Sequence, residues 1–440
     1  MPAAAGRRRA GRYRSAGACG ACWSHRMSHP ELLLDITRLM RRARHATPTG
    51  IDRVEMAHAD YLGRHAAGRL VYTAMHPCGW HVRLPAAATR RFLDDTARRW
   101  RGDRTGPRLA AWRLWAALCL SWPRLPRPWP SARRAVYLLL SHTNLERPAA
   151  VARALAAEQA RLACLVHDAI PLTHPEFARA GMADVHRRRM ETVDALADLV
   201  VCNSRATLQA IAGRLPRGPH GARLMVAPLG VAPPRAPGAD AGPSPGAPCF
   251  VMLGTIEPRK NHMLLLQLWQ RLVAQAGPAG APRLRIVGRS GWENAHILNL
   301  LARSPALRGV VTLTHGMADR DVATLLRCAR ALLMPSLAEG FGLPVAEALA
   351  LGVPVIASDL PALREAGGDA PEYLDPLDGP AWLRAIHDYT DAAAPRRRAQ
   401  LARIAAWRAP GWDDHCRMVL DAIDRLPDTA RPPTEANLAN

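Results

Sequence analysis

One lysine stands out among the basic residues of this chain. Lysine and arginine together number 59 in the 440 residues, and Lys260 is the only lysine. An exposed surface site tolerates the exchange of lysine for arginine. A site in contact with a phosphate does not, because a compact ammonium group and a planar guanidinium group differ in shape. Lys260 follows the apolar run Phe250 to Leu253, in the segment Gly-Thr-Ile-Glu-Pro-Arg-Lys-Asn over 254–261. We therefore expect it to contact a phosphate; chance survival on a solvated face is the alternative.

A second segment places two carboxylates beside a glycine-bearing loop. It reads Met-Pro-Ser-Leu-Ala-Glu-Gly-Phe-Gly-Leu-Pro-Val-Ala-Glu over 334–347. The pattern predicts a strand that ends near Ser336, then a loop, then a helix with Pro344 in its first turn. Free N–H groups at such a helix start form an anion site. Glu339 and Glu347 would then suit the hydroxyls of a sugar and a ribose, although Glu347 alone is more simply a charge that balances the helix dipole.

Polar residues also follow apolar runs in the first half of the chain. His167 and Asp168 come directly after the run Cys-Leu-Val over 164–166. Taken alone, a histidine at a strand end is more often structural than catalytic. The segments Ser-His-Thr-Asn over 141–144 and Asn-Ser-Arg over 203–205 have the same placement. They either line an acceptor site or serve the fold alone.

The elements that must position these residues alternate along the chain. Apolar runs predict strands at 32–36, 135–140, 163–166, 199–202, 223–227, 250–253, 284–287, 310–312, 331–334 and 353–357. Helical patterns lie between several of them, including 51–62, 149–161 and 182–197. Such alternation is typical of parallel sheets with crossover helices. We predict an α/β protein of two Rossmann-like, doubly wound domains that face a central cleft, with ligands at the carboxyl ends of the strands.

Composition excludes some classes of protein. Nine cysteines, an odd number, argue against a disulfide framework and for a reducing compartment. Cys19 and Cys22 have the spacing of half a zinc site, but no second pair follows, so we interpret them as incidental. The net charge is +22, yet aromatic residues are only 5% and no nucleic-acid module is recognisable, so nucleic acid is not the expected partner.

An anionic membrane surface fits the charge better. Trp100, Trp112, Trp115, Trp122 and Trp129 are interleaved with arginines. The apolar stretch 109–122 is shorter than the ~20 residues that a spanning helix needs, but suits a helix lying in the membrane interface. A buried helix followed by a proline-rich loop is the alternative. The Arg-rich first 26 residues lack an apolar signal core, so we expect a cytoplasmic protein, peripheral at the inner face of the cell membrane.

Residues 339–347, with their Glu-Gly-Phe-Gly-Leu-Pro-x-x-Glu pattern, resemble the E-x7-E motif of family 4 retaining glycosyltransferases (glycosyl transferases group 1), which have the GT-B fold. Other segments agree in order and spacing. Residues 254–261 resemble the family's diphosphate loop, 286–288 the strand and turn beside the nucleotide, and 358–367 the stretch after the motif. Residues 228–231 resemble the end of the N-terminal domain, and 412–426 the helix that returns toward it.

The resemblance implies roles for these residues. Lys260 and Arg259 would hold the donor diphosphate, Glu339 the sugar hydroxyls and Glu347 the ribose, while His167 would approach the reaction centre. The implied catalytic residues are His167, Arg259, Lys260 and Glu339, and the implied donor-binding residues are Gly50, Thr255, Gly288, Gly340, Phe341, Gly342, Leu343 and Glu347. No metal or other cofactor is implied beyond the nucleotide sugar as co-substrate.

One residue departs from the family pattern. Some members carry an arginine directly after the glycine of the diphosphate loop, where this chain has Thr255. Arg259 and Arg289 would then have to supply the second phosphate contact.

The resemblance also divides the chain. We expect a disordered extension or mis-assigned start over 1–26 and an N-terminal acceptor-side Rossmann-like domain over 27–231. A Pro/Gly linker over 232–248 would lead to a nucleotide-sugar-binding domain over 249–408. The returning helix would occupy 409–427 and a disordered tail 428–440.

The function implied is transfer of a hexose, with retention, to a glycan or lipid-linked glycan acceptor in surface polysaccharide biosynthesis. Residues 257–261 together with His167 to Pro171 look most like bacterial mannosyl- or rhamnosyltransferase-like members, which favours GDP-mannose as donor. Two alternatives stay open. One is another GT-B enzyme, such as a nucleotide-sugar epimerase or a phosphorylase; the other is a non-catalytic basic protein that binds membranes or nucleic acid.

Overall fold

The computed structural model describes residues 29–103, 109–120, 134–213, 215, 221–232 and 247–427. The expected extension over 1–26 with Cys19 and Cys22, most of the expected linker, and the expected tail over 428–440 lie outside these residues. Trp122 and Trp129 of the tryptophan-rich stretch also lie outside them.

The first half of the chain forms a seven-stranded sheet in the order β3-β2-β1-β4-β5-β6-β7. The strands are β1 (Glu31–Asp35), β2 (Leu70–Met75), β3 (His81–Arg83), β4 (Ala135–Leu139), β5 (Ala160–Val166), β6 (Ala197–Cys202) and β7 (Arg223–Val226). All neighbouring pairs are parallel except β2 and β3. Alternate residues of β1 face opposite sides, with Leu32 and Leu34 in one core and Leu33 in the other. Both faces are therefore buried under helices, as is usual for parallel sheets.

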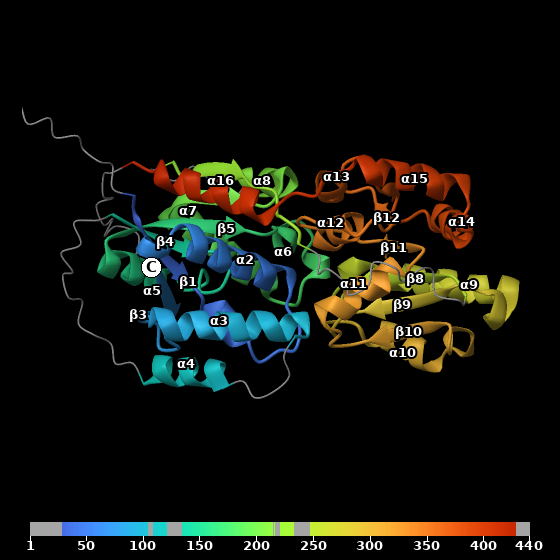
Figure 1. The fold of residues 1–440 in the computed structure, drawn as a ribbon, viewed down its shortest axis with the longest axis horizontal. Helices are drawn as coiled ribbons and strands as arrows, with labels where there is room; N and C mark the ends of the chain where they lie inside the picture. The colour runs from blue at the N-terminus through green and yellow to red at the C-terminus, as the bar shows by residue number, and fades with distance from the viewer. Residues whose placement is uncertain are drawn as a thin grey trace, which may run out of the picture.

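The second half forms a fully parallel six-stranded sheet in the order β10-β9-β8-β11-β12-β13. Its strands are β8 (Cys249–Leu253), β9 (Arg283–Val287), β10 (Val311–Thr314), β11 (Ala331–Met334), β12 (Val355–Ser358) and β13 (Glu372–Leu374). Figure 1 shows the two halves side by side, each with its own sheet and helices. The prediction of an α/β fold with two doubly wound parallel sheets is confirmed.

The helices of the first half are α1 (Thr37–Arg42), α2 (Gly50–His65), α3 (Ala86–Arg101), α4 (Leu109–Cys119), α5 (Pro148–Glu158), α6 (Ile170–Thr173), α7 (Met182–Leu196) and α8 (Arg205–Ala212). Those of the second half are α9 (His262–Gly280), α10 (Ala295–Arg303), α11 (Asp319–Arg327), α12 (Leu343–Ala350), α13 (Pro361–Gly367), α14 (Gly379–Thr390) and α15 (Pro395–Ala406). Short 3-10 turns are η1 (Ala67–Arg69), η2 (Pro175–Phe177), η3 (Pro258–Lys260) and η4 (Pro305–Leu307), and the last helix is α16 (Trp412–Asp424).

Some elements differ from the sequence prediction. The strands β2, β3 and β13 were not predicted; β3 and β13 have only three residues each and lie at sheet edges. The predicted helix over 149–161 is too long. It ends at Glu158 because Gln159 adopts a left-handed conformation with φ of 48°, and Ala160 already belongs to β5.

The tryptophan-rich stretch has a mixed role. Trp100 is buried and its indole N–H donates to the His45 carbonyl, while Trp115 donates to the Met40 carbonyl at 2.9 Å. These two rings serve the core, as the alternative interpretation expects. Trp112 on α4 is 70% exposed. Among the described residues, no helix combines the length and apolar character needed to cross a membrane.

The helix α16 packs on the first half although it follows the second half in sequence (Figure 1). Its Cys416, Val419 and Ile423 join the core of the first sheet. Gly230 lies directly against its start, where a Cβ atom would be 2.2 Å from Trp412 N. Only glycine permits this approach.

We expect Gly230→Ala to lower the free energy of unfolding by roughly 1–3 kcal/mol, because the new methyl group would displace the start of α16. Urea unfolding followed by circular dichroism measures this. Gly213→Ala is the matched control, since a Cβ atom there meets no heavy atom within 4 Å. Equal stability of the two variants would contradict the role of the close contact.

Candidate active site

The loop after β8 turns Lys260 inward. Gly254 has φ of +145°, and its missing side chain leaves room for the lysine stem, since a Cβ atom there would lie 3.3 Å from Lys260 Cε. The turn η3 ends at Lys260, and Asn261 with φ of 57° then starts α9. Lys260 is only 5% exposed as a result. The solvated-surface alternative for this residue is therefore wrong.

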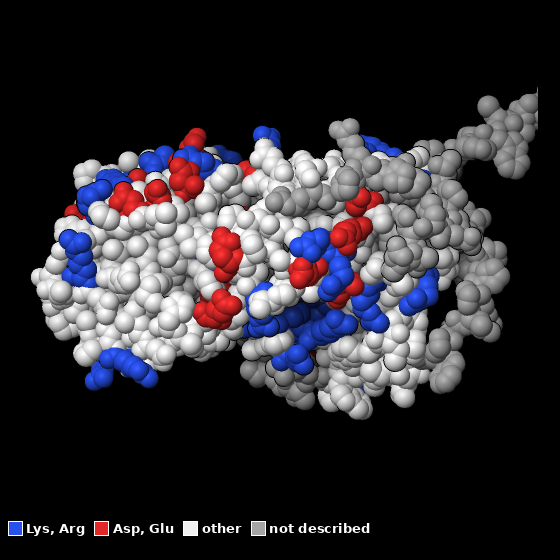
Figure 2. Space-filling view, turned by 180° about the vertical axis from the view of Figure 1, so that it is seen from behind, with Lys and Arg blue, Asp and Glu red and all other residues white. Residues whose placement is uncertain are grey.

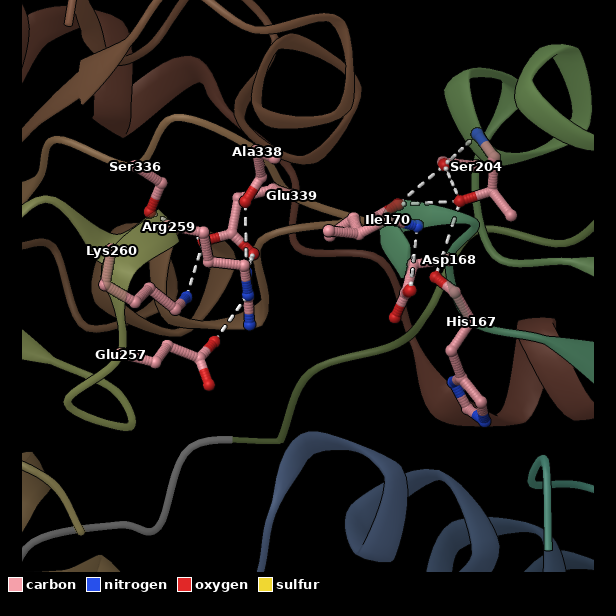
Figure 3. A network of polar contacts seen from close by, with 12 residues as sticks. His167, Asp168, Ile170, Ser204, Glu257, Arg259, Lys260, Ser336, Ala338 and Glu339 are labelled. Atoms are coloured by element: carbon pink, nitrogen blue, oxygen red, sulfur yellow. Dashed lines mark hydrogen bonds and ion pairs between the residues drawn. The ribbon is translucent and has the colours of Figure 1, made fainter. Parts of the chain in front are cut away.

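Lys260 belongs to a buried cluster of alternating charges (Figure 3). Its Nζ lies 2.5 Å from Glu339 Oε1. Arg259 donates from Nη1 to Glu339 Oε2 at 2.8 Å, and its Nε lies 2.5 Å from Glu257 Oε1. The Ser336 hydroxyl donates to Glu339 Oε1 at 2.7 Å. Thus the diphosphate loop and the glutamate loop, which are about 80 residues apart in sequence, are joined through the Glu339 carboxylate.

The electrostatics of the cluster keep Glu339 ionised. Burial by itself raises the pKa of the Glu339 carboxyl, but the charges of Lys260 and Arg259 outweigh it and bring the pKa to about 2. Burial lowers the pKa of Lys260, and the nearby Glu339 offsets part of that effect. Burial also raises the pKa of Glu257. The two cations are therefore held in place by carboxylates before any ligand arrives.

The glycine loop between Glu339 and α12 packs against the first half of the chain. The Gly340 carbonyl accepts hydrogen bonds from the Ser204 hydroxyl at 2.7 Å and the Thr207 hydroxyl at 3.2 Å. A Cβ atom on Gly340 would lie 2.2 Å from the His167 carbonyl oxygen, so this position requires glycine. The amide N–H groups of Phe341 and Gly342 donate to no group in the described part of the chain. They remain available to a ligand at the start of α12.

Leu343 and Gly50 meet across the two halves. A Cβ atom on Gly50 would lie 3.3 Å from Leu343 Cδ1. Gly50 is the first residue of α2, and Thr49 caps that helix through a capping box with Asp52. Gly50, which the resemblance implies as a donor-binding residue, thus lies beside the motif loop.

Glu347 lies apart from the Lys260 cluster, in α12 and near α2. Its Oε1 is 3.7 Å from Arg53 Nε, and Arg53 donates two hydrogen bonds of 2.7 Å each to the Asp319 carboxylate. Burial raises the pKa of Glu347, and Arg53 offsets part of that shift. Arg53 comes from the first half, so this ion pair connects both halves next to the second motif glutamate.

Gly288 brings the ends of β8 and β9 together. A Cβ atom on it would lie 1.7 Å from the Gly254 carbonyl oxygen, which no side chain could accommodate. The Ile256 N–H donates to the Arg289 carbonyl at 2.8 Å. Thr255, which stands where some members of the family carry an arginine, is half-buried on this same loop.

His167 is buried at the end of β5. Its Nε2 lies 2.8 Å from the Leu140 carbonyl, which can only accept, so Nε2 donates and Nδ1 is left as an acceptor. Burial lowers the pKa of His167 to about 4, and the ring is uncharged at neutral pH. Figure 3 shows the ring directed away from the cluster of Lys260 and Glu339, with which it shares no hydrogen bond. The structure therefore does not bring His167 into that cluster.

The loops over 141–144 and 203–205 serve the fold. The Asn203 amide donates to the His167 carbonyl at 2.8 Å, and Ser204 caps α8 by accepting from the Thr207 N–H. His142 is buried, and its Nε2 accepts from the His167 N–H. The structural interpretation of these loops is the one that the contacts favour.

Sequence reasoning missed three participants: Ser336, Arg53 and Asp319. No sequence pattern links Arg53 to a partner 266 residues away. No group of three or more His, Cys, Asp or Glu residues in the described ranges is arranged to hold a metal ion. The site thus offers paired cations, free amides and carboxylates, which suit a diphosphate and the hydroxyls of sugars.

Comparisons with known proteins agree with these features. The family model "Glycosyl transferases group 1" matches residues 239–371. The serotype-specific mannosyltransferase WbdA of Escherichia coli is 28% identical over 252 residues, which cover 53% of this chain and 30% of that protein. O-antigen chain mannosyltransferase B of Escherichia coli is 38% identical over 178 residues, which cover 40% of this chain and 45% of that protein. The chain spans less than half the length of either relative.

Among solved structures, HepE of Anabaena in complex with UDP-glucose has a TM-score of 0.60 and 14% identity. The match covers 90% of this chain and 99% of that one. At this identity the likeness concerns the fold. Residues 239–371 of this chain thus match the glycosyl transferases group 1 model, and the chain as a whole has the GT-B fold.

Proposed function

We propose that this protein is a retaining glycosyltransferase that moves a hexose from a nucleoside diphosphate sugar to a glycan or lipid-linked glycan acceptor in surface polysaccharide biosynthesis. The observation that carries the proposal is the joining of Lys260 and Arg259 to Glu339, beside the free amides of Phe341 and Gly342. Mannose from GDP-mannose is the proposed donor pair. Its support is that both Escherichia coli relatives are mannosyltransferases.

In the proposed mechanism, the bond from the sugar C1 to the diphosphate breaks while the acceptor oxygen attacks C1 from the same face. The acceptor proton passes to the leaving phosphate oxygen, so the configuration is retained. Lys260 and Arg259 stabilise the charge that develops on the diphosphate. Glu339 both fixes these cations and lies where a carboxylate can accept hydrogen bonds from sugar hydroxyls. Glu347 would bind the ribose once its ion pair with Arg53 has opened.

His167 is retained in the proposal as a neutral residue near the donor sugar. Its unprotonated Nδ1 can accept a hydrogen bond. Because its pKa is about 4, the ring carries no charge at neutral pH. Thr255 and Gly288 would bound the nucleotide at the ends of β8 and β9. Closure of the two halves would exclude water from the donor.

The first test is a thermal-shift screen with GDP-, UDP-, ADP- and dTDP-sugars, followed by transfer of radiolabel from the stabilising donor to a lipid extract. We expect GDP-mannose to stabilise the protein and to label the extract, at a rate unchanged by EDTA because the two cations replace a metal. Isomerised donor without transfer would indicate an epimerase, and a sugar phosphate product a phosphorylase. Nucleic-acid binding without donor binding would indicate the non-catalytic alternative.

Lys260→Arg should reduce transfer by roughly 100-fold or more, because it displaces a pre-positioned positive charge from the developing anion. The longer, planar guanidinium group cannot take the buried place of the ammonium group beside Glu339. Initial rates measure the effect, and the thermal midpoint checks that the fold persists. Arg285→Lys, on the exposed side of β9, is the control and should transfer normally. Normal turnover by the Lys260 variant would refute the argument from its uniqueness.

We also propose that the protein is cytoplasmic and binds an anionic membrane peripherally. The support is the net charge of +22 and the exposed Trp112 and Leu109 on α4. Figure 2 shows Lys and Arg side chains gathered near the middle of one face.

Flotation with liposomes should recover the protein with anionic vesicles and not with neutral ones. Trp112→Glu should reduce recovery, whereas Leu377→Glu should not, although it alters an even more exposed apolar residue of the second half. Equal recovery with both lipids, or none, would rule out the peripheral-membrane proposal.

A further inference from the structure

Arg53 reaches from the first half of the chain to two carboxylates of the second half. It lies near the start of α2, the helix that begins at Gly50. Its Nη1 and Nη2 atoms donate to the two carboxylate oxygens of Asp319, each at 2.7 Å. Asp319 is the first residue of α11. Bidentate pairs of this kind are among the strongest contacts between a guanidinium group and a carboxylate, so Asp319 fixes the Arg53 side chain.

The contact of Arg53 with Glu347 is of another kind. Arg53 Nε lies 3.7 Å from Glu347 Oε1, which makes an ion pair but is too long for a hydrogen bond. A ligand can therefore replace Arg53 at Glu347 while Arg53 stays bound to Asp319. The Glu347 side chain is 23% exposed, so its carboxylate is within reach of such a ligand.

Arg53 is the cation that acts on Glu347 among the described residues. Burial raises the pKa of Glu347, Arg53 lowers it and Asp319 raises it. The elements β11, β12 and α13 also pack against α12 and bring no second cation to this carboxylate. The two strands contain no charged residue. On α13, Arg364 forms an ion pair just before its own helix, and Glu365 binds the start of α8.

The cation beside Glu347 therefore comes from the opposite half of the chain. α11 and α12 belong to the second half, whereas α2 belongs to the first. If the halves separate, Glu347 keeps Asp319 as a charged neighbour and loses Arg53. Two carboxylates in a partly buried place repel each other, which favours the protonated form of one of them. The charge of Glu347 thus depends on whether the halves are together.

Another charged contact joins the halves without involving this group. The Glu365 carboxylate accepts hydrogen bonds from the Arg205 N–H at 2.7 Å and from the Ala206 N–H at 2.8 Å, at the start of α8. It contains neither Arg53 nor Glu347. A substitution of Glu365 therefore separates a general effect of closure from a specific effect of Arg53.

We propose that Arg53 is a positioning residue for Glu347: with the halves together, it holds this carboxylate charged and in place until the ribose of the nucleoside diphosphate replaces it. The inference rests on the proposed glycosyltransferase function and adds a residue to its donor site. Ribose hydroxyls donate to a carboxylate, and hydrogen bonds to an ionised group are the stronger ones. Because Arg53 belongs to the first half, recognition of the ribose is coupled to closure of the two halves.

The experiment measures ribose preference by calorimetry on the full chain. The probes are GDP, or the diphosphate of the nucleoside that the donor screen selects, and its dideoxy analogue, which lacks the ribose hydroxyls. We expect the unsubstituted protein to prefer the ribose form by roughly tenfold or more, as for hydrogen bonds to a charged group. Arg53→Gln should reduce this preference to roughly threefold or less. Glu365→Gln, the matched control, should weaken binding of both probes by the same factor.

The pH dependence adds a measurement that a purely structural role would not change. Without Arg53 the pKa of Glu347 rises further, so the carboxyl binds its proton at a higher pH. The ribose preference is present while Glu347 is ionised and is lost as the pH falls through this pKa. We therefore expect the loss to begin at a higher pH in Arg53→Gln than in the unsubstituted protein or in Glu365→Gln. Both probes carry the same diphosphate, so the titration of the diphosphate cancels.

A second variant guards against loss of the fold. Arg53→Gln leaves Asp319 without its partner, and a buried charge that has lost its partner destabilises a protein. Arg53→Gln combined with Asp319→Asn removes both charges together. This double variant should lose the ribose preference as well, and it carries the test if the thermal midpoint shows that the single variant is unfolded.

Three results would overturn the inference: an unchanged ribose preference in Arg53→Gln, an equal change of preference in Glu365→Gln, or tighter binding of the ribose form by Arg53→Gln, which would make Arg53 a competitor of the ribose. Failure of the proposed function looks different. A protein whose ribose preference depends on Arg53 but that transfers no sugar would refute the function and support the inference. A protein that binds no nucleoside diphosphate would refute both.

Discussion

A buried charge must be paired, and in this protein one carboxylate pairs two cations from a different loop. Glu339 holds the buried Lys260 and the partly buried Arg259, which ties the end of β8 to the end of β11. Removing one partner of such a pair costs more than the pair itself contributes, because the other charge stays buried. The geometry at the edge of the second sheet is therefore set by the same residues that we assign to the diphosphate.

The two halves meet through backbone as much as through side chains. Gly340 sits against the His167 carbonyl and accepts hydrogen bonds from Ser204 and Thr207, while Gly50 faces Leu343. Contacts of this kind leave no room for a side chain, so small residues stand where the halves approach most closely. The charged cluster of Lys260, Arg259 and Glu339 lies directly beside these contacts, because Glu339 precedes Gly340 in the same loop.

The sequence predicted the parts of this site that are local. The motif spacing located Glu339 and Glu347, and the single lysine located Lys260, because each depends on residues within one loop. The partners of those residues could not be predicted. The pairing of Lys260 with Glu339 and of Arg53 with Asp319 depends on which elements, distant in sequence, lie next to each other in the fold. No short-range sequence pattern predicts this. Short edge strands such as β3 were missed for a related reason, since three residues carry too little periodicity.

The contact of Gly230 with the start of α16 has a mechanical consequence. The chain passes between the halves twice, after Val231 and before Trp412, and the Val231 N–H donates to the Pro410 carbonyl at 2.9 Å. The two passages thus leave the first half as a bonded pair. A paired connection resists twisting more than a single strand does. We therefore expect the halves to open and close by a hinge rotation about this connection, without twisting relative to each other. That restriction would return Arg53 of the first half to Asp319 and Glu347 of the second half after every opening.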